Sequence, residues 1–179
     1  MNVNAAQPRS TPGRRHIDRN RWVSIRPIER SDASALSDFY AGLSPESRYR
    51  RFLSYGQRTA AEIQRRFASG GAEGFVGILD APGPHDGAVV AHASVHSLAD
   101  GTAEIAFAVA DDFQGRGIGT ALMEAVVHYA RLTGLRCLTA NLMADNVRMR
   151  RLLHGTGCEI VGDRVDHGVE EMALDLAAG

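Results

Sequence analysis

Hydrophobic residues in the first third of the chain recur at the three- and four-residue spacing of a helix. Leu36, Phe39 and Leu43 follow this spacing. Ser44 followed by Pro45 is typical of the start of a second helix, because Ser is a favoured N-cap and Pro fits the first helical turn. The elements expected here are a short strand over residues 22–25 and helices over residues 33–43, 44–52 and 59–68.

From residue 74 the hydrophobic runs become shorter and are separated by turn residues, which is typical of β-strands. The segment "DAPGPHDG" and the pair Asp100-Gly101 predict tight turns, so the strands around them are expected to form an antiparallel meander. A long amphipathic helix then ends at Gly134. The expected strands are 74–79, 88–96, 103–110, 135–140, 158–162 and 169–176, with a last helix over 146–154. This order predicts an α/β fold with a mixed sheet and one parallel crossover.

The composition is that of one globular domain. Of 179 residues, 44% are hydrophobic and 23% charged, and the formal net charge is −1. We expect a flexible basic arm over residues 1–21 and one domain over residues 22–178, in the cytoplasm. The balanced charge and the lack of a long apolar run argue against a nucleic acid partner and a membrane span. Cys137 and Cys158 lie in apolar segments and are expected to be buried, reduced thiols.

The segment "ADDFQGRGIGT" carries the strongest chemical signal in the sequence. Gly115, Gly117 and Gly119 fall between an expected strand and an expected helix. Backbone N–H groups at a helix N-terminus attract anions, and glycines let a phosphate approach the backbone closely. The loop therefore predicts a phosphate site, although a tightly packed strand–helix turn would also explain the glycines.

Two common phosphate loops do not fit. A P-loop requires a lysine, and the chain contains none. A Rossmann dinucleotide site requires a different glycine spacing within a βαβ unit and an acidic residue about 20 positions later. Here the loop follows an antiparallel meander, and the next strand carries no acidic residue.

The six residues Gln114-Gly115-Arg116-Gly117-Ile118-Gly119 resemble the Q/R-x-x-G-x-G/A loop of the GCN-type N-acetyltransferase (GNAT) superfamily. The resemblance extends over roughly residues 22–176. It implies a mixed, mostly antiparallel sheet of about six or seven strands flanked by four or five helices. It also implies acetyl-CoA as co-substrate and no metal. The implied cofactor-binding residues are Phe107, Ala108, Val109, Gln114, Gly115, Arg116, Gly117, Ile118, Gly119, Thr120 and Asn146.

The resemblance also implies catalytic roles. Glu104, in "AEIAFAV", stands where related lysine acetyltransferases carry a glutamate that acts as general base, although a solvated strand carboxylate remains an alternative. Alternation would place Glu104 on a face otherwise lined by alanines. Backbone groups over residues 107–110 would stabilise the oxyanion and bind the pantetheine arm of the cofactor. Asn146 either contacts the pantetheine or is simply a helix N-cap, and Asn141 is expected to be structural.

The chain departs from the family at the general acid. Leu153 occupies the position of the tyrosine that protonates the leaving thiol in some relatives. This leaves two alternatives open, an enzyme that uses water as the acid and a CoA-binding sensor or interaction module without catalysis.

Only the N-terminal segment indicates which kind of amine would accept the acetyl group. Residues 25–52 resemble the start of bacterial protein-lysine acetyltransferases, which implies a primary amine on a protein, while a small-molecule amine stays an alternative. Three arginines of this segment would then contact an acidic protein surface or form a solvated face: Arg48, Arg50 and Arg51. A homodimer is compatible with the sequence.

Overall fold

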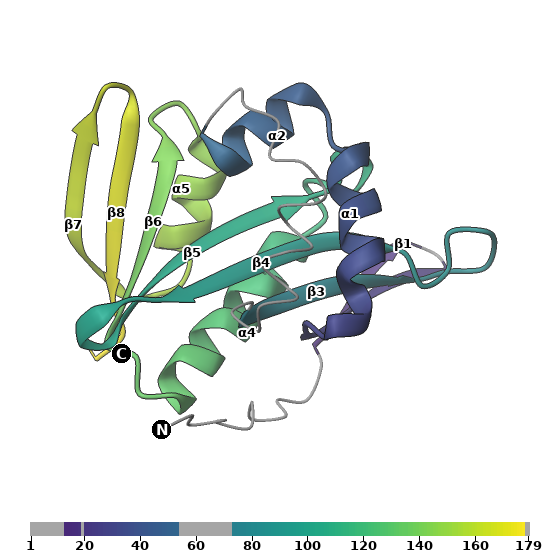
Figure 1. Ribbon diagram of the computed structural model, residues 1–179, viewed down its shortest axis with the longest axis horizontal. Coiled ribbons are helices and arrows are strands. Elements are labelled where there is room, and N and C mark those ends of the chain that lie inside the picture. Colours follow the sequence, from purple (N-terminus) through teal and green to yellow (C-terminus); the bar gives the residue numbers. More distant parts are fainter. Residues whose placement is uncertain (1–12, 19, 54–72, 178–179) are drawn as a thin grey trace.

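The computed structural model describes residues 13–18, 20–53 and 73–177. This part of the chain forms four α-helices and one eight-stranded sheet (Figure 1). The helices are α1 (Ala33–Gly42), α2 (Pro45–Phe52), α4 (Ile118–Leu132) and α5 (Val147–His154). The strands are β1 (Arg14–Asp18), β2 (Arg21–Pro27), β3 (Glu73–Asp80), β4 (Val89–Ser97), β5 (Thr102–Val109), β6 (Cys137–Met143), β7 (Glu159–Asp166) and β8 (Val169–Asp175).

The strands lie in the order β1-β2-β3-β4-β5-β6-β8-β7. Every neighbouring pair is antiparallel except β5 and β6. These two are parallel because α4 connects them, and such a crossover returns the chain to the end of the sheet from which it started. The predicted α/β fold, with a mixed, mostly antiparallel sheet and one parallel crossover, is confirmed.

Strand β1 was not expected. It pairs with β2, with Arg15 opposite Val23, and it gives the sheet one strand more than the six or seven predicted. The segment predicted as a flexible basic arm over residues 1–21 thus contains a strand, Arg14–Asp18, which the prediction missed. Only Ile17 of this strand packs against the core, so the strand has no hydrophobic alternation that a sequence pattern could reveal. Residues 1–12 of that arm lie outside the described residues.

Helices cover both faces of the sheet, with α1 and α2 in front of it and α4 behind it in Figure 1. Leu122 of α4 and Leu153 of α5 lie in the larger hydrophobic cluster together with Ile105 of β5. Leu36 and Phe39 of α1 belong to a second cluster on the opposite face. The segment after β5 contacts the first turn of α2 through hydrogen bonds of Asp111. The helix predicted over residues 59–68 lies outside the described residues.

Local hydrogen bonds and one glycine conformation explain where α2 and β6 begin. The side chain of Ser44 accepts a hydrogen bond from Ser47 N, which confirms its predicted role as the N-cap of α2. Strand β6 begins at Cys137 rather than at residue 135. The reason is that Gly134 takes a φ of 77° and Leu135 N bonds back to Ala130 O, so both residues end α4 instead of starting the strand.

Candidate functional site

Strands β5 and β6 pair over only a short stretch. Thr102, Ala103 and Glu104 pair with residues 137–139 of β6, although β5 continues to Val109 and β6 to Met143. The two strands diverge beyond this point (Figure 1), and α2 contacts both of them. Among the described residues, the β6-facing edge of β5 therefore has no partner strand beyond Glu104.

Glu104 lies at the point of divergence. Its side chain is half-buried, and it stands opposite His96 of β4 in the pairing register. Asn141 of β6 approaches from the other side, with its Nδ2 3.5 Å from Glu104 Oε1, at the long end of the hydrogen-bond range. The structure thus places Asn141, which was expected to be structural only, beside the candidate base.

The predicted alternation of β5 is confirmed. Ile105 is buried, and Phe107 and Val109 pack against the same hydrophobic cluster as α4. Ala108 packs in the cluster of α1 on the opposite face. Glu104 is therefore on the face of the sheet that α1 and α2 cover.

A buried polar pair lies deeper on this face. The hydroxyl of Tyr40 and Nδ1 of His92 are 2.8 Å apart, and both residues are buried. Burial lowers the pKa of His92 to about 3, and the charge of Arg51 acts in the same direction while Asp32 opposes it. Burial also raises the pKa of Tyr40. His92 is consequently a poor proton acceptor near pH 7, so the candidate base on this face is Glu104, at the point where β5 and β6 diverge.

The glycine loop has an anion-binding geometry. Gly115 and Gly117 adopt φ values of 73° and 78°, a conformation that favours glycine. Gly117 is the N-cap of α4 and supplies no side-chain cap. Within the described residues, the backbone N–H groups of residues 115–120 have no hydrogen-bond partner. These donors and the positive end of the helix dipole fit the pyrophosphate of acetyl-CoA.

Packing alone does not explain the three glycines. A Cβ atom at Gly115 would meet nothing within 4 Å, and one at Gly119 would lie 3.7 Å from Leu152, an ordinary van der Waals contact. Only Gly117 is crowded, and there the nearest atoms belong to the end of the Arg15 side chain. This weighs against a loop whose glycines serve packing alone and favours one that is open to a ligand.

The side chain of Gln114 holds the loop in place. Its Nε2 donates to Ser47 Oγ and to the carbonyl of Val109, both at 3.1 Å, and its Oε1 accepts from Arg148 Nη1. Gln114 thus joins the end of β5 to α2 and α5. In this arrangement its side chain positions the loop instead of pointing toward a ligand.

Asp111 provides a second attachment for α2. It accepts hydrogen bonds from the backbone N–H of Ser44 at 2.9 Å and from the hydroxyls of Ser44 and Ser47. Burial raises the pKa of Asp111, but these hydrogen bonds outweigh it and hold the pKa below its usual range. The sequence offered no signal for this contact.

Other residues predicted to bind the cofactor are placed as follows. Ile118 is buried, so only its backbone faces the loop, whereas Thr120 is exposed. The guanidinium of Arg116 donates to Asp112 O and lies 3.4 Å from Asp18. Asn146 Oδ1 accepts from Met149 N at 3.1 Å, which confirms that Asn146 is an N-cap. Its contact to pantetheine stays a prediction.

Leu153, at the position of the missing tyrosine, is fully buried in the core. The neighbouring His154 is exposed on α5. The correspondence of Leu153 to the tyrosine acid of some relatives stays a prediction.

The arginines of α2 make contacts within the protein. Arg48 donates to the carbonyls of Ala41 and Leu43. Arg50 pairs with Glu46 of the same helix at 3.0 Å, and Arg51 Nη2 donates to Ser94 Oγ at 2.8 Å. These contacts join α2 to α1 and β4, so the three arginines do not form a freely solvated face.

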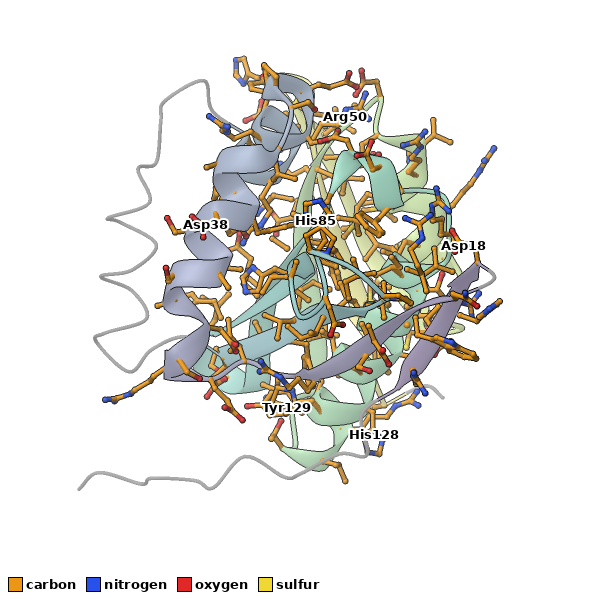
Figure 2. The ribbon with its side chains drawn as sticks, turned by 90° about the vertical axis from the view of Figure 1, so that its right-hand side faces the viewer. Asp18, Asp38, Arg50, His85, His128 and Tyr129 are labelled. Carbon is orange, nitrogen blue, oxygen red and sulfur yellow. The ribbon has the colours of Figure 1, made fainter. Side chains whose placement is uncertain are left out.

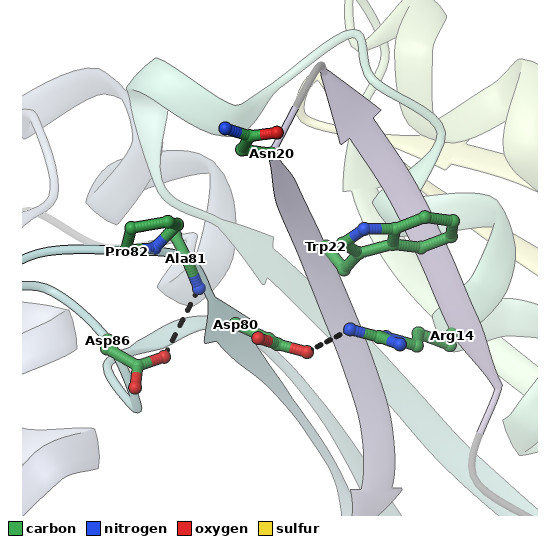
Figure 3. Close-up of a pocket in the computed structure, with 7 residues that line it drawn as sticks. All are labelled: Arg14, Asn20, Trp22, Asp80, Ala81, Pro82 and Asp86. Carbon is green, nitrogen blue, oxygen red and sulfur yellow. Dashed lines mark hydrogen bonds and ion pairs between the residues drawn. The ribbon is translucent and has the colours of Figure 1, made fainter.

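A hollow of about 430 Å³ lies away from this site, where β1, β2 and the turn after β3 meet (Figure 3). Arg14 pairs with Asp80 across it, and Trp22 forms part of its wall. It includes none of the residues predicted for the site.

In the part of the chain that the structure describes, no helix is long and apolar enough to cross a membrane. The same residues contain no group of three or more His, Cys, Asp or Glu side chains arranged to hold a metal ion.

Comparisons with known proteins identify relatives of this chain. The profile of the acetyltransferase (GNAT) family matches residues 35–157. Acetyltransferase Pat of Mycolicibacterium smegmatis is 35% identical over 159 residues, which cover 87% of this chain and 46% of that protein. The chain thus spans about half the length of this curated relative.

Solved structures show the same fold. The GNAT domain of S. lividans PAT matches with a TM-score of 0.71 and 27% identity, over 86% of this chain and 90% of that chain. A phosphinothricin acetyltransferase from Sinorhizobium meliloti, solved in complex with acetyl-CoA, matches with a TM-score of 0.67 and 19% identity, over 86% and 88% of the two chains. The chain belongs to the acetyltransferase (GNAT) family, a family of acetyl-CoA-dependent N-acetyltransferases.

Proposed function

We propose that this protein transfers the acetyl group of acetyl-CoA to a lysine side chain of a protein, with Glu104 as the general base. One observation carries the proposal. Glu104 lies where β5 separates from β6, and the same strand leads directly into the glycine loop with its free N–H groups. This supports a mechanism in which one strand carries both the base and the start of the donor site. Acetyl-CoA, when bound, supplies the thioester that the amine attacks.

The amine must lose a proton before it attacks, because the pKa of a lysine ammonium is about 10.4 in solution. Glu104 can accept this proton directly or through one water molecule. Its half-buried side chain lies on the face of the sheet that α2 covers, and Asn141 lies within reach of Oε1. Asn141 would hold the carboxylate in one orientation, while the open edge of β5 receives the reacting groups.

Direct attack is supported over an acyl-cysteine route. Burial and the charge of Asp175 raise the pKa of Cys137, so its reactive thiolate is disfavoured. Cys158 is buried beneath α4, with Arg131 Nη2 3.9 Å from its sulfur. Neither thiol is placed as a nucleophile. Because Leu153 cannot donate a proton, water is the acid that protonates the leaving thiolate.

The lysine acceptor rests on the resemblance of residues 25–52 to protein-lysine acetyltransferases. α2, the last helix of that segment, covers the face of the sheet that carries Glu104. A small-molecule amine is the competing acceptor. A panel containing proteins, lysine peptides and small amines separates the two, because a protein lysine acetyltransferase should show a far higher kcat/KM for proteins or peptides.

The test of the base is Glu104→Gln, which keeps the size of the side chain and removes its basicity. We expect kcat to fall by about 100-fold or more while the Kd for acetyl-CoA stays nearly unchanged. His96→Gln is the matched control, because His96 is the cross-strand neighbour of Glu104 and also titratable. Unchanged turnover in Glu104→Gln across the pH range would refute the assignment. A large loss confined to His96→Gln would transfer the role to that histidine.

A non-catalytic module is the remaining alternative. It would bind acetyl-CoA with the same Kd in wild type and in Glu104→Gln and release no thiol with any acceptor of the panel. Thiol release by the wild-type protein that depends on both an acceptor and Glu104 would exclude it.

A further inference from the structure

Strand β1 brings an arginine to the glycine loop from about a hundred residues earlier in the sequence. Arg15 stands opposite Val23 in the β1–β2 register, and Val23 is fully buried on the face that α4 covers. Arg15 therefore points to the side of the sheet where α4 begins. The end of β1 also approaches this loop, since Asp18, labelled in Figure 2, lies 3.4 Å from Arg116.

The guanidinium of Arg15 lies directly against Gly117. A Cβ atom at Gly117 would lie 2.4 Å from Arg15 Nη2 and 2.8 Å from Nε, closer than real Cβ atoms come to any group. The absent side chain of Gly117 thus makes room for Arg15. The guanidinium is consequently next to the backbone N–H groups that open toward an anion.

Among the described arginines near the loop, Arg15 is the one whose guanidinium has no hydrogen-bond or ion-pair partner. Arg116 and Arg21 both pair with Asp18, and Arg148 donates to Gln114. The side chain of Arg15 is exposed and forms no hydrogen bond or ion pair with the part of the chain that the structure describes. A guanidinium that lies beside an anion site and has no other partner can form charge-assisted hydrogen bonds with the bound anion.

We propose that Arg15 binds a phosphate group of acetyl-CoA and is a cofactor-binding residue that the N-terminal strand adds to the loop. The inference rests on the acetyl-CoA site of the proposed function. An arginine suits this role because it presents several N–H donors to phosphate oxygens and keeps its charge at any pH of interest. The phosphate belongs either to the pyrophosphate, which the loop N–H groups would also contact, or to the 3′-phosphate of the nucleotide.

The test is isothermal titration of the full chain with CoA and with 3′-dephospho-CoA. Arg15→Gln should weaken CoA binding by about 10-fold, the usual order for one charge-assisted hydrogen bond, and Arg15→Lys by less. The matched control is Arg14→Gln, which removes the same charge from the adjacent residue of the same strand. Arg14 pairs with Asp80 on the other face (Figure 3), so its loss should leave the Kd for CoA within about twofold.

The two ligands locate the contact. If Arg15 binds the 3′-phosphate, the effect of Arg15→Gln disappears with 3′-dephospho-CoA, and if it binds the pyrophosphate, the effect persists. Equal Kd values for wild type and Arg15→Gln with CoA would overturn the inference, as would equal losses in Arg14→Gln and Arg15→Gln. A wild-type protein that binds no CoA would instead refute the proposed function, so the two failures are distinguishable. Thermal denaturation of each variant shows whether β1 stays folded.

Discussion

His92 should make the stability of the fold depend on pH in a way that can be calculated. Its imidazole is buried with the hydroxyl of Tyr40 2.8 Å from Nδ1, and burial, with help from Arg51, lowers its pKa from 6.5 to about 3. The unfolded chain therefore binds a proton near pH 6.5, whereas the folded chain resists it. Stability contributed in this way is fully present above pH 6.5 and is lost as the pH falls toward 3.

The magnitude at pH 5 follows from the two pKa values. With an unfolded value of 6.5 and a folded value of about 3, protonation of the unfolded state lowers the free energy of unfolding by about 2 kcal/mol between pH 8 and pH 5. This is a large part of the 5–15 kcal/mol that is typical of a domain, and it corresponds to roughly 5 °C in Tm for a chain of this size.

The measurement is urea denaturation of wild type and His92→Gln at pH 8 and pH 5. Gln does not titrate, and its amide can replace the hydrogen bond to Tyr40, so the variant should lose about 2 kcal/mol less than wild type over this interval. The carboxylates become protonated in both proteins, so their effect on the free energy of unfolding cancels in the comparison. Equal losses in the two proteins would refute the reasoning, because they would mean that His92 becomes protonated as readily in the folded as in the unfolded chain.

Two further substitutions test the arrangement of the site. Leu153→Tyr should not raise kcat and should lower the free energy of unfolding by about 1–3 kcal/mol, because the position is fully buried and a larger side chain overpacks it. Leu153→Met is its volume-matched control, and a faster Leu153→Tyr enzyme of unchanged stability would show that the position reaches the leaving thiol. Asp111→Ala should cost about 1 kcal/mol, because Ser44 and Ser47 lose their acceptor at an exposed site. It should also raise the KM of the acceptor more than that of acetyl-CoA, and an unchanged acceptor KM would show that this contact does not position α2 for the acceptor.

The parts of the site that the sequence predicted are those carried by contiguous residues. The glycine loop, the strand before it and the helix after it lie within about thirty residues, and their spacing alone indicated an anion site. Alternation along β5 correctly separated the face of Glu104 from that of Ile105. The N-cap of α5 at Asn146 was visible for the same reason, since capping acts over three residues.

The parts of the site that the sequence could not predict depend on contacts between residues far apart in the chain. Asp111 and Ser44 are 67 residues apart, and neither belongs to a motif that indicates the other. Strand β1 is held by backbone pairing with β2, and its side chains are mostly charged, so it resembles a disordered basic segment until its partner is known. Arg15 was therefore assigned to an arm. Its position against Gly117 follows only from the register of that pairing.

Two residues beside the glycine loop also hold α2, the helix that covers the face of Glu104. Gln114 immediately precedes the glycine loop, yet its side chain contacts Ser47 of α2 and Arg148 of α5. Asp111, a few residues earlier, holds the first turn of α2. The loop therefore cannot shift without moving the helix that covers Glu104, because these hydrogen bonds join the two. In the proposed mechanism these hydrogen bonds would keep Glu104 and the anion site in one relative geometry, which direct transfer between two bound substrates requires.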